Sequence, residues 1–245
     1  MRQYEVQVRM GSVAVDAYSL ENSAEIPLVL LPGIMSDATA WSAVAGPLSA
    51  DRAVHVVNRR GRHPSTDLPA GYSLRTEIED LIAVLGSIAR PAHLFGWSLG
   101  ALVALEAVAA GAGVKSLILY EPVMAPFGKE QTEPLRTARE HGDYDAMVEI
   151  VNRDISGYSQ AHVENLRTDQ ATWEHLLALA IPLADEIEAL NAFTPHLEGY
   201  DSIAKPVTVL RGSESGLVYE APCTRAIQAL NRPMVVSLQG QDHLI

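Results

Sequence analysis

The pentapeptide GWSLG at residues 96–100 constrains this chain more than any other segment does. It has the pattern G-x-S-x-G, it follows the apolar run 92–95, and it precedes a helical run over 101–110. A serine between a strand and a helix sits on a sharp turn, and flanking glycines let the two elements approach each other closely. The pattern therefore predicts that the Ser98 hydroxyl projects above a sheet as a nucleophile, with the amide of Leu99 placed to stabilise an oxyanion.

The remaining sequence alternates strand patterns with helix patterns. A hairpin is predicted where apolar and polar residues alternate over 3–10 and 13–18, around Gly11 and Ser12. Continuous apolar runs predict buried strands, and apolar residues at helical spacing predict helices. This order predicts an α/β protein with an open, mostly parallel sheet, whose site lies at the carboxyl ends of the strands. Besides the hairpin, strands are expected at 27–31, 53–58, 92–95, 114–120, 206–211 and 234–238, and helices at 40–49, 74–89, 101–110 and 219–230.

One long segment interrupts the alternation. The roughly 80 residues after Glu121 show no strand pattern, and this is too many for an ordinary loop. We expect residues 123–204 to form an inserted helical cap over the site, on a core made of residues 1–122 and 205–245. A helical insertion with only a packing role is the alternative. The helical patterns in this segment cover 132–140, 144–151, 159–167, 172–179 and 183–190.

Composition excludes several classes of protein. The 245 residues carry a formal net charge of −12 and no basic cluster that offers a footprint for phosphates, so nucleic acid is not an expected partner. No apolar run approaches the length of a membrane span, and the N-terminus has no signal-peptide core, so no membrane partner is expected. The single Cys223 cannot form an intrachain disulfide and favours a reducing compartment. We therefore expect a cytoplasmic protein that acts on a small-molecule substrate.

The sequence also contains no motif for a metal or a cofactor. There is no C-x-x-C, no H-E-x-x-H and no dense cluster of histidine and aspartate, and neither G-x-G-x-x-G nor a P-loop is present. We therefore expect chemistry that uses no metal and no cofactor.

Four motifs together resemble those of the α/β-hydrolase superfamily, over nearly the whole chain. Beside the serine pentapeptide they are LLPGIMSDATAW at 30–41, NRRGRHPS at 58–65 and QGQDH at 239–243. In the superfamily these positions hold the strand and oxyanion loop, a D-x-R-G-x-G-x-S loop and a terminal G-x-x-H loop. The resemblance implies an α/β-hydrolase fold, in which a mostly parallel sheet carries an N-terminal antiparallel hairpin and an inserted helical cap. It constrains the chemistry less than the fold, because one fold hosts many reactions.

The resemblance implies an oxyanion hole made of two backbone amides. One belongs to the residue after the nucleophile, here Leu99, and the other follows a His-Gly pair at the end of an earlier strand. This chain has Pro32-Gly33 at that pair, so the second donor is the amide of Ile34. Because the donor is a backbone group, the loss of the histidine need not remove the hole. A simple strand-ending turn is the alternative for Pro32-Gly33.

His243 is the best candidate for the general base. It follows the last predicted strand in a glycine-containing loop, and the chain order of serine before histidine matches the resemblance. The other histidines are expected to be structural or solvated. They are His55, His63, His93, His141, His162, His175 and His196.

Two glutamates compete for the role of the acid that orients this histidine. The family's commonest acid follows the strand predicted at 206–211, in a pattern like G-x-x-D, where this chain has Ser215 and Glu214 lies one residue off register. The other placement is the end of the preceding strand, which Glu121 closes. A carboxylate there can fix the tautomer of His243, and a charge at the end of a buried strand needs a buried partner. We favour Glu121 and keep Glu214 as the alternative acid.

These features predict a serine hydrolase that cleaves a small carboxylic ester or a related acyl compound through an acyl-enzyme. Ser98 attacks the carbonyl, His243 accepts its proton, and the amides of Ile34 and Leu99 hold the oxyanion. Two alternatives stay open. The same constellation serves a carbon–carbon bond hydrolase or a lyase, with His243 as a lone base, and a non-catalytic ligand receptor retains the same pocket.

Overall fold

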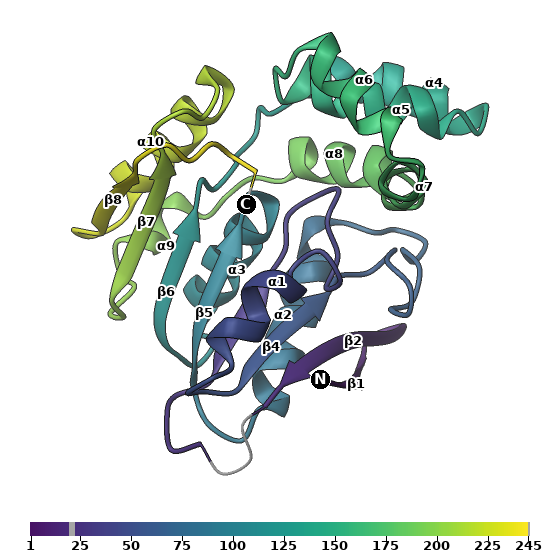
Figure 1. Cartoon of the computed structure of the whole chain (residues 1–245). Coiled ribbons are helices and arrows are strands. Elements are labelled where there is room, and N and C mark those ends of the chain that lie inside the picture. Colours follow the sequence, from purple (N-terminus) through teal and green to yellow (C-terminus); the bar gives the residue numbers. More distant parts are fainter. Residues whose placement is uncertain (20–22, 245) are drawn as a thin grey trace.

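Eight strands of the computed structural model, which describes residues 1–19 and 23–244, form one sheet in the order β1-β2-β4-β3-β5-β6-β7-β8 (Figure 1). β1 and β2 form an antiparallel hairpin, β2 is antiparallel to β4, and every other neighbouring pair is parallel. The predicted fold class, a mostly parallel sheet with an N-terminal hairpin, is therefore confirmed. The strands are β1 (Arg2–Val8), β2 (Gly11–Tyr18), β3 (Leu28–Leu31), β4 (Val54–Asn58), β5 (Ala92–Trp97), β6 (Val114–Tyr120), β7 (Val207–Gly212) and β8 (Met234–Leu238).

The hairpin turn lies two residues earlier than the turn predicted around Gly11 and Ser12. Val8 pairs with Gly11, so Arg9 and Met10 make the turn and Gly11 opens β2. A Cβ on Gly11 would lie 2.7 Å from the Cβ of Thr66, so this glycine permits a close approach of another loop. Residues 20–22 and 245, which the predicted core ranges include, lie outside the described residues.

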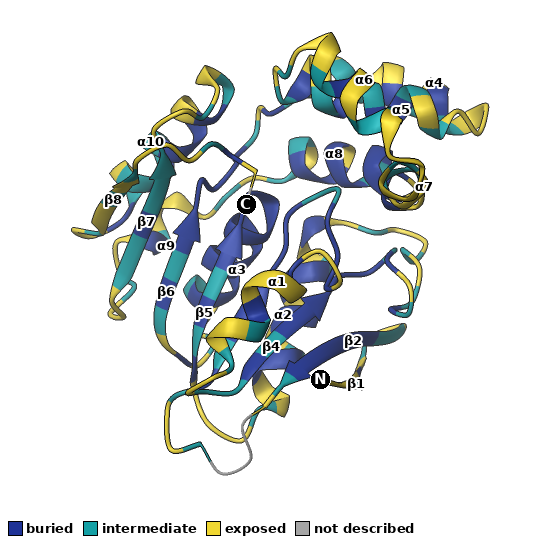
Figure 2. Cartoon of the chain, in the orientation of Figure 1, coloured by how far each residue is buried: buried dark blue, intermediate teal, exposed yellow. Residues whose placement is uncertain are grey.

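Alternating side chains of the central strands face two helical layers. Val29 and Leu31 of β3 pack in the cluster that contains α2 (Leu74–Ser87) and α3 (Leu99–Ala109). Leu30 points to the other face, where it joins the cluster that contains α1 (Ser42–Leu48). Because side chains of a strand alternate between the two faces of a sheet, the apolar run of β3 can serve both layers. Figure 2 shows α3 and the central strands as the most buried part of the molecule.

The segment between β6 and β7 contains helices and no strand among its described residues, as the sequence predicts. Figure 1 shows α4, α5 and α6 as a layer beyond the edge of the sheet, with α8 between that layer and the core, and α8 contacts both α4 and α2. The division of the chain into a core and a cap domain stays a prediction. The helices of this segment are α4 (Thr132–Glu140), α5 (Tyr144–Glu149), α6 (Gln160–Thr168), α7 (Gln170–Leu179), α8 (Leu183–Ala192) and α9 (Leu197–Tyr200), and a π-helical turn (Ile150–Ile155) follows α5.

The start of α3 lies unusually close to the end of β3. A Cβ on Gly100 would overlap the carbonyl oxygen of Leu31 and would lie 2.5 Å from that of Pro32. Both atoms belong to the backbone and cannot rotate away as a side chain can. Glycine at position 100 therefore allows the helix that follows Ser98 to rest directly on the chain that leads to Ile34.

We predict that Gly100→Ala destabilises the protein by about 1–3 kcal/mol, because the new methyl group overpacks a contact between two backbones. The matched control is Gly86→Ala near the end of α2, where an added Cβ meets nothing within 4 Å. Alanine there should stabilise the helix by about 0.5–1 kcal/mol. The midpoints of urea unfolding measure both changes, and equal midpoints for the two variants would contradict the close approach.

Candidate active site

Ser98 occupies the turn between β5 and α3. Its backbone angles are φ 56° and ψ −120°, in a region that residues with a side chain seldom adopt. Its amide donates to the carbonyl of Tyr120 at the end of β6, at 2.9 Å. α3 begins at the next residue, so the strand, the strained serine and the helix follow in the order that the sequence predicts. The residue is 3% exposed.

The loop after β3 passes directly beside this serine. A Cβ on Gly33 would lie 2.9 Å from the Cβ of Ser98, so the loop and the turn are in contact. Ile34 follows Gly33 and lines the same cavity as Ser98. Leu99 is the first residue of α3, and the amide at that position has no acceptor within its own helix. The convergence of the Ile34 and Leu99 amides on one point stays a prediction.

His243 and Glu121 form a buried pair at the carboxyl end of the sheet. Nδ1 of His243 lies 2.7 Å from Oε2 of Glu121, and the two residues are 4% and 3% exposed. The amide of Gly212, at the end of β7, donates to the other carboxylate oxygen at 2.8 Å. The backbone of His243 is also held, because Nε1 of Trp97 donates to its carbonyl at 2.8 Å. Two parallel strands and the elbow therefore fix one imidazole.

The alternative acid has a different environment. Glu214 is exposed, and its backbone amide donates to the carbonyl of Gln241 at 2.9 Å. Ser215, at the family's commonest acid position, is half-buried. The geometry places the carboxylate of Glu121, and not that of Glu214, on the imidazole of His243. A catalytic role for either glutamate stays a proposal.

An aromatic ring that sequence analysis missed covers the imidazole. Tyr219 stacks on His243 with a centroid separation of 3.6 Å and an angle of 12° between the planes. Tyr219 lies in a short 3-10 turn that leads into α10 (Glu220–Ala229). No local sequence signal marks this stacking, because it joins two segments that the sheet brings together.

A cavity of about 160 Å³ joins these residues to the helical segment. Ser98 and His243 are among its lining residues, and most of its lining is apolar. The π-helical turn after α5 contributes Val151 and Asn152, which fits the frequent use of such turns at functional sites. The other lining residues are Ile34, Met35, Trp97, Phe127, Ser156, Tyr158, His162, Leu166, Thr172, Leu176, Tyr219 and Leu244.

The model of the Alpha/beta hydrolase family matches residues 28–245. The chain belongs to the alpha/beta hydrolase family. Membership of this family supports a hydrolytic enzyme, and the superfamily that the sequence motifs resemble is thereby confirmed.

Known proteins show how far the likeness extends. N-formylmaleamate deformylase of Pseudomonas putida is 34% identical over 105 residues, which are 42% of this chain and 39% of the deformylase. The match thus spans about two fifths of the length of that curated relative.

Solved structures share the fold at lower identity, and at these identities the likeness shows the fold alone. An alpha/beta hydrolase from Sphaerobacter thermophilus has a TM-score of 0.83 at 23% identity, with 99% of this chain and 95% of that chain covered. An enol-lactonase from Burkholderia xenovorans has a TM-score of 0.79 at 17% identity, with 96% and 91% covered. An esterase from Rhodococcus sp. has a TM-score of 0.74 at 21% identity, with 99% and 92% covered.

Burial and hydrogen bonding set the protonation of the histidine–glutamate pair. Burial lowers the pKa of His243 below its usual value, and the hydrogen bond to Glu121 offsets only part of this effect. Burial alone would raise the pKa of Glu121, but hydrogen bonds, led by that from His243, lower it. A neutral imidazole beside an ionised carboxylate carries its proton on Nδ1, which leaves Nε2 free to accept a proton.

Sequence analysis also missed a buried ionic cluster beside the loop of Ile34. Arg59, Arg62, Glu77 and Glu186 are each less than 5% exposed and bind one another. The signal available in the sequence is the density of arginine in NRRGRHPS, directly after a buried strand. Their partners lie in α2 and α8, so the sequence alone does not pair them.

Neither a metal-binding group nor a membrane-spanning helix occurs within residues 1–19 and 23–244. No group of three or more His, Cys, Asp or Glu residues in this part is arranged to hold a metal ion. No helix in this part combines the length and the apolar character that crossing a membrane requires.

We predict that kcat/KM for a p-nitrophenyl ester rises with pH through an apparent pKa below 6.5, because the base must be neutral and burial lowers the pKa of His243. Glu121→Gln removes the contact that raises this pKa, so the acid limb should move to still lower pH in that variant. Profiles of kcat/KM from pH 4 to pH 9 measure both. An acid limb above 6.5 in the wild type would contradict the assignment to His243.

A second prediction separates the two glutamates. Glu121→Gln keeps the shape of the side chain but allows the wrong tautomer of His243, so kcat should fall by about ten-thousandfold, as an equivalent change does in a serine protease triad. Glu214→Gln, in an exposed loop, is the matched control and should stay within about twofold of the wild type. The kcat of both variants on one ester decides between them, with circular dichroism as the check on folding. A crippled Glu214→Gln beside an active Glu121→Gln would reverse the assignment.

Proposed function

We propose that the protein is a serine hydrolase of small carboxylic esters or related acyl compounds, and that it acts through an acyl-enzyme. Ser98 is the nucleophile, His243 the general base and Glu121 the acid that orients it. The amides of Ile34 and Leu99 form the oxyanion hole. The observation that carries this proposal is the 2.7 Å contact between His243 and Glu121, at the cavity that Ser98 also lines.

The proposal assigns each step of the reaction to one group. The substrate carbonyl enters the cavity and Ser98 Oγ attacks its carbon, while Nε2 of His243 accepts the hydroxyl proton. The carbonyl oxygen becomes an oxyanion, and two backbone amides stabilise it where it forms. The charged imidazole is stabilised by Glu121, which lies on Nδ1 and stays ionised because hydrogen bonds lower its pKa.

The release of the alcohol and the hydrolysis of the acyl-enzyme use the same groups. His243 gives its proton to the leaving alcohol, and an ester of Ser98 stays behind. A water molecule then attacks this ester, and His243 removes its proton. Collapse of the second tetrahedral intermediate releases the acid and restores the serine.

The cavity favours a small acyl group. Its volume of about 160 Å³ is close to that of an engineered protein cavity of about 150 Å³ that binds benzene. An acyl group about the size of benzoyl or butanoyl therefore fits inside the cavity.

A second candidate substrate is an N-formyl amide. The matched relative from Pseudomonas putida is named for deformylation of N-formylmaleamate. A formyl group is the smallest acyl group, and the same serine, histidine and oxyanion amides serve its hydrolysis. The cleaved bond is then C–N and the acyl-enzyme is a formate ester.

A reducing, cytoplasmic environment fits the single cysteine, which is buried in α10.

We predict that Ser98→Ala lowers kcat on p-nitrophenyl acetate by about a millionfold, because it removes the nucleophile. The melting temperature should change little, since alanine can occupy the same backbone turn without loss of a packed side chain. Ester turnover and a fluorophosphonate probe, with the labelled residue identified by mass spectrometry, measure the change. Ser202→Ala, which alters an exposed serine after α9, is the control and should keep both turnover and labelling.

The outcomes separate the open alternatives. Labelling of Ser98 together with turnover of an ester or a formamide supports the hydrolase. Labelling without turnover of either substrate favours the carbon–carbon bond hydrolase, the lyase or the ligand receptor. Substantial turnover by Ser98→Ala would overturn the proposed nucleophile.

A further inference from the structure

The guanidinium of Arg59 holds the peptide that leads to Ile34. Its Nη1 donates to the carbonyl of Gly33 at 2.7 Å, and the arginine is 2% exposed. Gly33 contacts Ser98, so this hydrogen bond lies at the edge of the proposed oxyanion hole.

The planarity of the peptide bond extends this contact to the amide of Ile34. The Gly33 carbonyl and the Ile34 N–H belong to one peptide unit, and this unit is trans. In a trans peptide the two groups point in opposite directions, so a donor that fixes the carbonyl also fixes the direction of the N–H. With its carbonyl bound to Arg59, the peptide presents the Ile34 N–H on the opposite side of the loop.

Two carboxylates hold the guanidinium in place. Glu77 of α2 accepts from Nε at 2.6 Å and from Nη2 at 2.7 Å, and Glu186 of α8 also accepts from Nη2. Burial alone would lower the pKa of Arg59, but the two glutamates raise it well above its usual value. The guanidinium therefore stays charged, and a charged donor makes a stronger hydrogen bond to the Gly33 carbonyl.

A second arginine holds the other end of the same loop. Nε of Arg62 donates to the carbonyl of Ser36 at 2.9 Å, and its two Nη atoms donate to the carboxylate of Glu186 at 2.7 and 2.9 Å. The loop between the two bound carbonyls contains Ile34 and Met35, and Met35 has a φ of 53°. Glu186 thus joins both arginines, and no part of its side chain is exposed.

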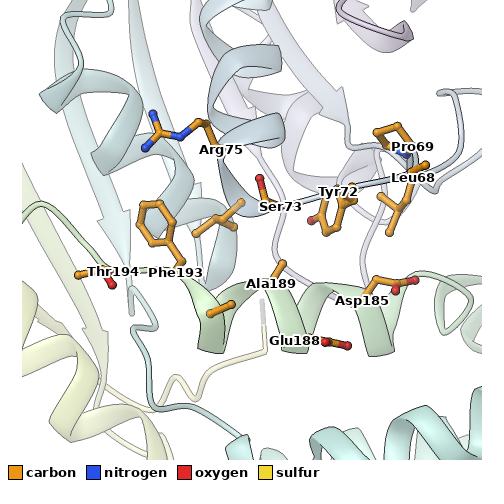
Figure 3. Close-up of a pocket in the computed structure, with 14 residues that line it drawn as sticks. Leu68, Pro69, Tyr72, Ser73, Arg75, Asp185, Glu188, Ala189, Phe193 and Thr194 are labelled. Atoms are coloured by element: carbon orange, nitrogen blue, oxygen red, sulfur yellow. The ribbon is translucent and has the colours of Figure 1, made fainter.

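Glu186 belongs to the helical segment, whereas the two arginines lie in the loop after β4 and their carbonyl acceptors lie in the loop after β3. Figure 3 shows the outer side of this junction, where Tyr72 on one side of a cavity of about 750 Å³ faces Asp185 and Ala189 of α8 on the other. The hydroxyl of Tyr72 donates to the carboxylate of Glu77, so Tyr72 joins the hydrogen bonds of this cluster. The position of α8 is therefore coupled to the guanidinium that binds Gly33.

We propose that Arg59 is a positioning residue for the oxyanion hole, and that Glu186 couples its position to the seating of α8. The inference rests on the proposed function, since it assigns the Ile34 amide to the oxyanion. It adds that the hole is complete only when the helical segment is docked on the sheet. Arg59 acts through the peptide and does not itself contact the substrate.

The test compares Arg59→Lys with Arg60→Lys. Lysine is a compact donor that cannot hold Glu77 and the Gly33 carbonyl together in the way a guanidinium does. Arg60 is an adjacent buried arginine that also pairs with a carboxylate of α2, Asp80, but its other acceptors are the carbonyls of Arg9 and Met10 in the hairpin turn. It therefore controls for the loss of a buried ion pair without contact to the oxyanion loop.

Turnover and a transition-state analogue report on the oxyanion hole itself. Removal of a full oxyanion donor costs about a hundredfold to a thousandfold in kcat. For Arg59→Lys we expect kcat on p-nitrophenyl acetate to fall about tenfold to a hundredfold, with KM changed less than about threefold. The affinity for a trifluoromethyl ketone, which forms an oxyanion on the serine, should fall by the same factor. Arg60→Lys should leave kcat and ketone affinity within about twofold of the wild type.

Two further variants keep the test decisive. Arg59→Gln combined with Glu77→Gln removes the ion pair without leaving an unpaired charge, and it replaces Arg59→Lys if that variant does not fold. Glu186→Gln tests the coupling to α8, and it should lower kcat and ketone affinity together. All variants are measured well below their melting temperatures.

One outcome would overturn the inference and leave the proposed function intact: the wild-type protein hydrolyses the ester, and the Arg59 variants have the same kcat and ketone affinity as Arg60→Lys. A wild-type chain that neither turns over esters or formamides nor binds the ketone at Ser98 would overturn the proposed function and this inference together. A parallel loss of kcat and ketone affinity in the Arg59 variants alone supports the assignment.

Discussion

The close approach of α3 to the end of β3 is the constraint on which the rest of this site depends. Gly100 lets the first turn of the helix rest on the carbonyls of Leu31 and Pro32, and Gly33 lets the next loop contact Ser98. A Cβ at either position would overlap atoms of the neighbouring segment, so the two segments would have to move apart. The proposed nucleophile and the two residues of the proposed oxyanion hole lie at or beside this contact, so backbone packing brings these three segments together.

The surrounding loops compensate for what the chain lacks relative to its family. Proline stands where the family has the histidine of the oxyanion motif, and asparagine stands where it has the aspartate of the D-x-R-G-x-G-x-S loop. Asn58 uses the difference: its amide group donates to the carbonyls of Arg62 and His63 and its oxygen accepts from the amide of Ala38. An ionised aspartate could not make the two donations. Arg59 and Arg62 hold the carbonyls of Gly33 and Ser36 in the loop after β3, and both bind Glu186, which connects α8 to this loop.

Local patterns predicted most of the fold because each element carries its own signal. β8 and α4 begin and end at the predicted residues, and β6 does as well. The errors fall where a distant segment decides. The alternation pattern predicts a hairpin around Gly11 and Ser12, whereas Arg9 and Met10 make the turn and the lack of a side chain on Gly11 permits the contact with Thr66. The burial of Glu77 inside α2 and of Glu186 inside α8 was not predicted, because their arginine partners lie 18 and 127 residues away.

The sequence by itself determined the α/β fold, the strained serine turn and the identity of a histidine near the C-terminus as the best candidate base. These follow from residues that are adjacent in the chain, where spacing and backbone preference are sufficient. Only the tertiary structure decided which glutamate lies on that histidine, because Glu121 and Glu214 both follow strands that end at the same edge of the sheet. The order of β6 and β7 in the sheet, and the bond from Gly212 to Glu121, place one carboxylate on the imidazole and leave the other in solvent. The connection from α8 to the oxyanion loop is also decided only by the tertiary structure, because charges that pair across long sequence separations leave no periodic pattern in the sequence.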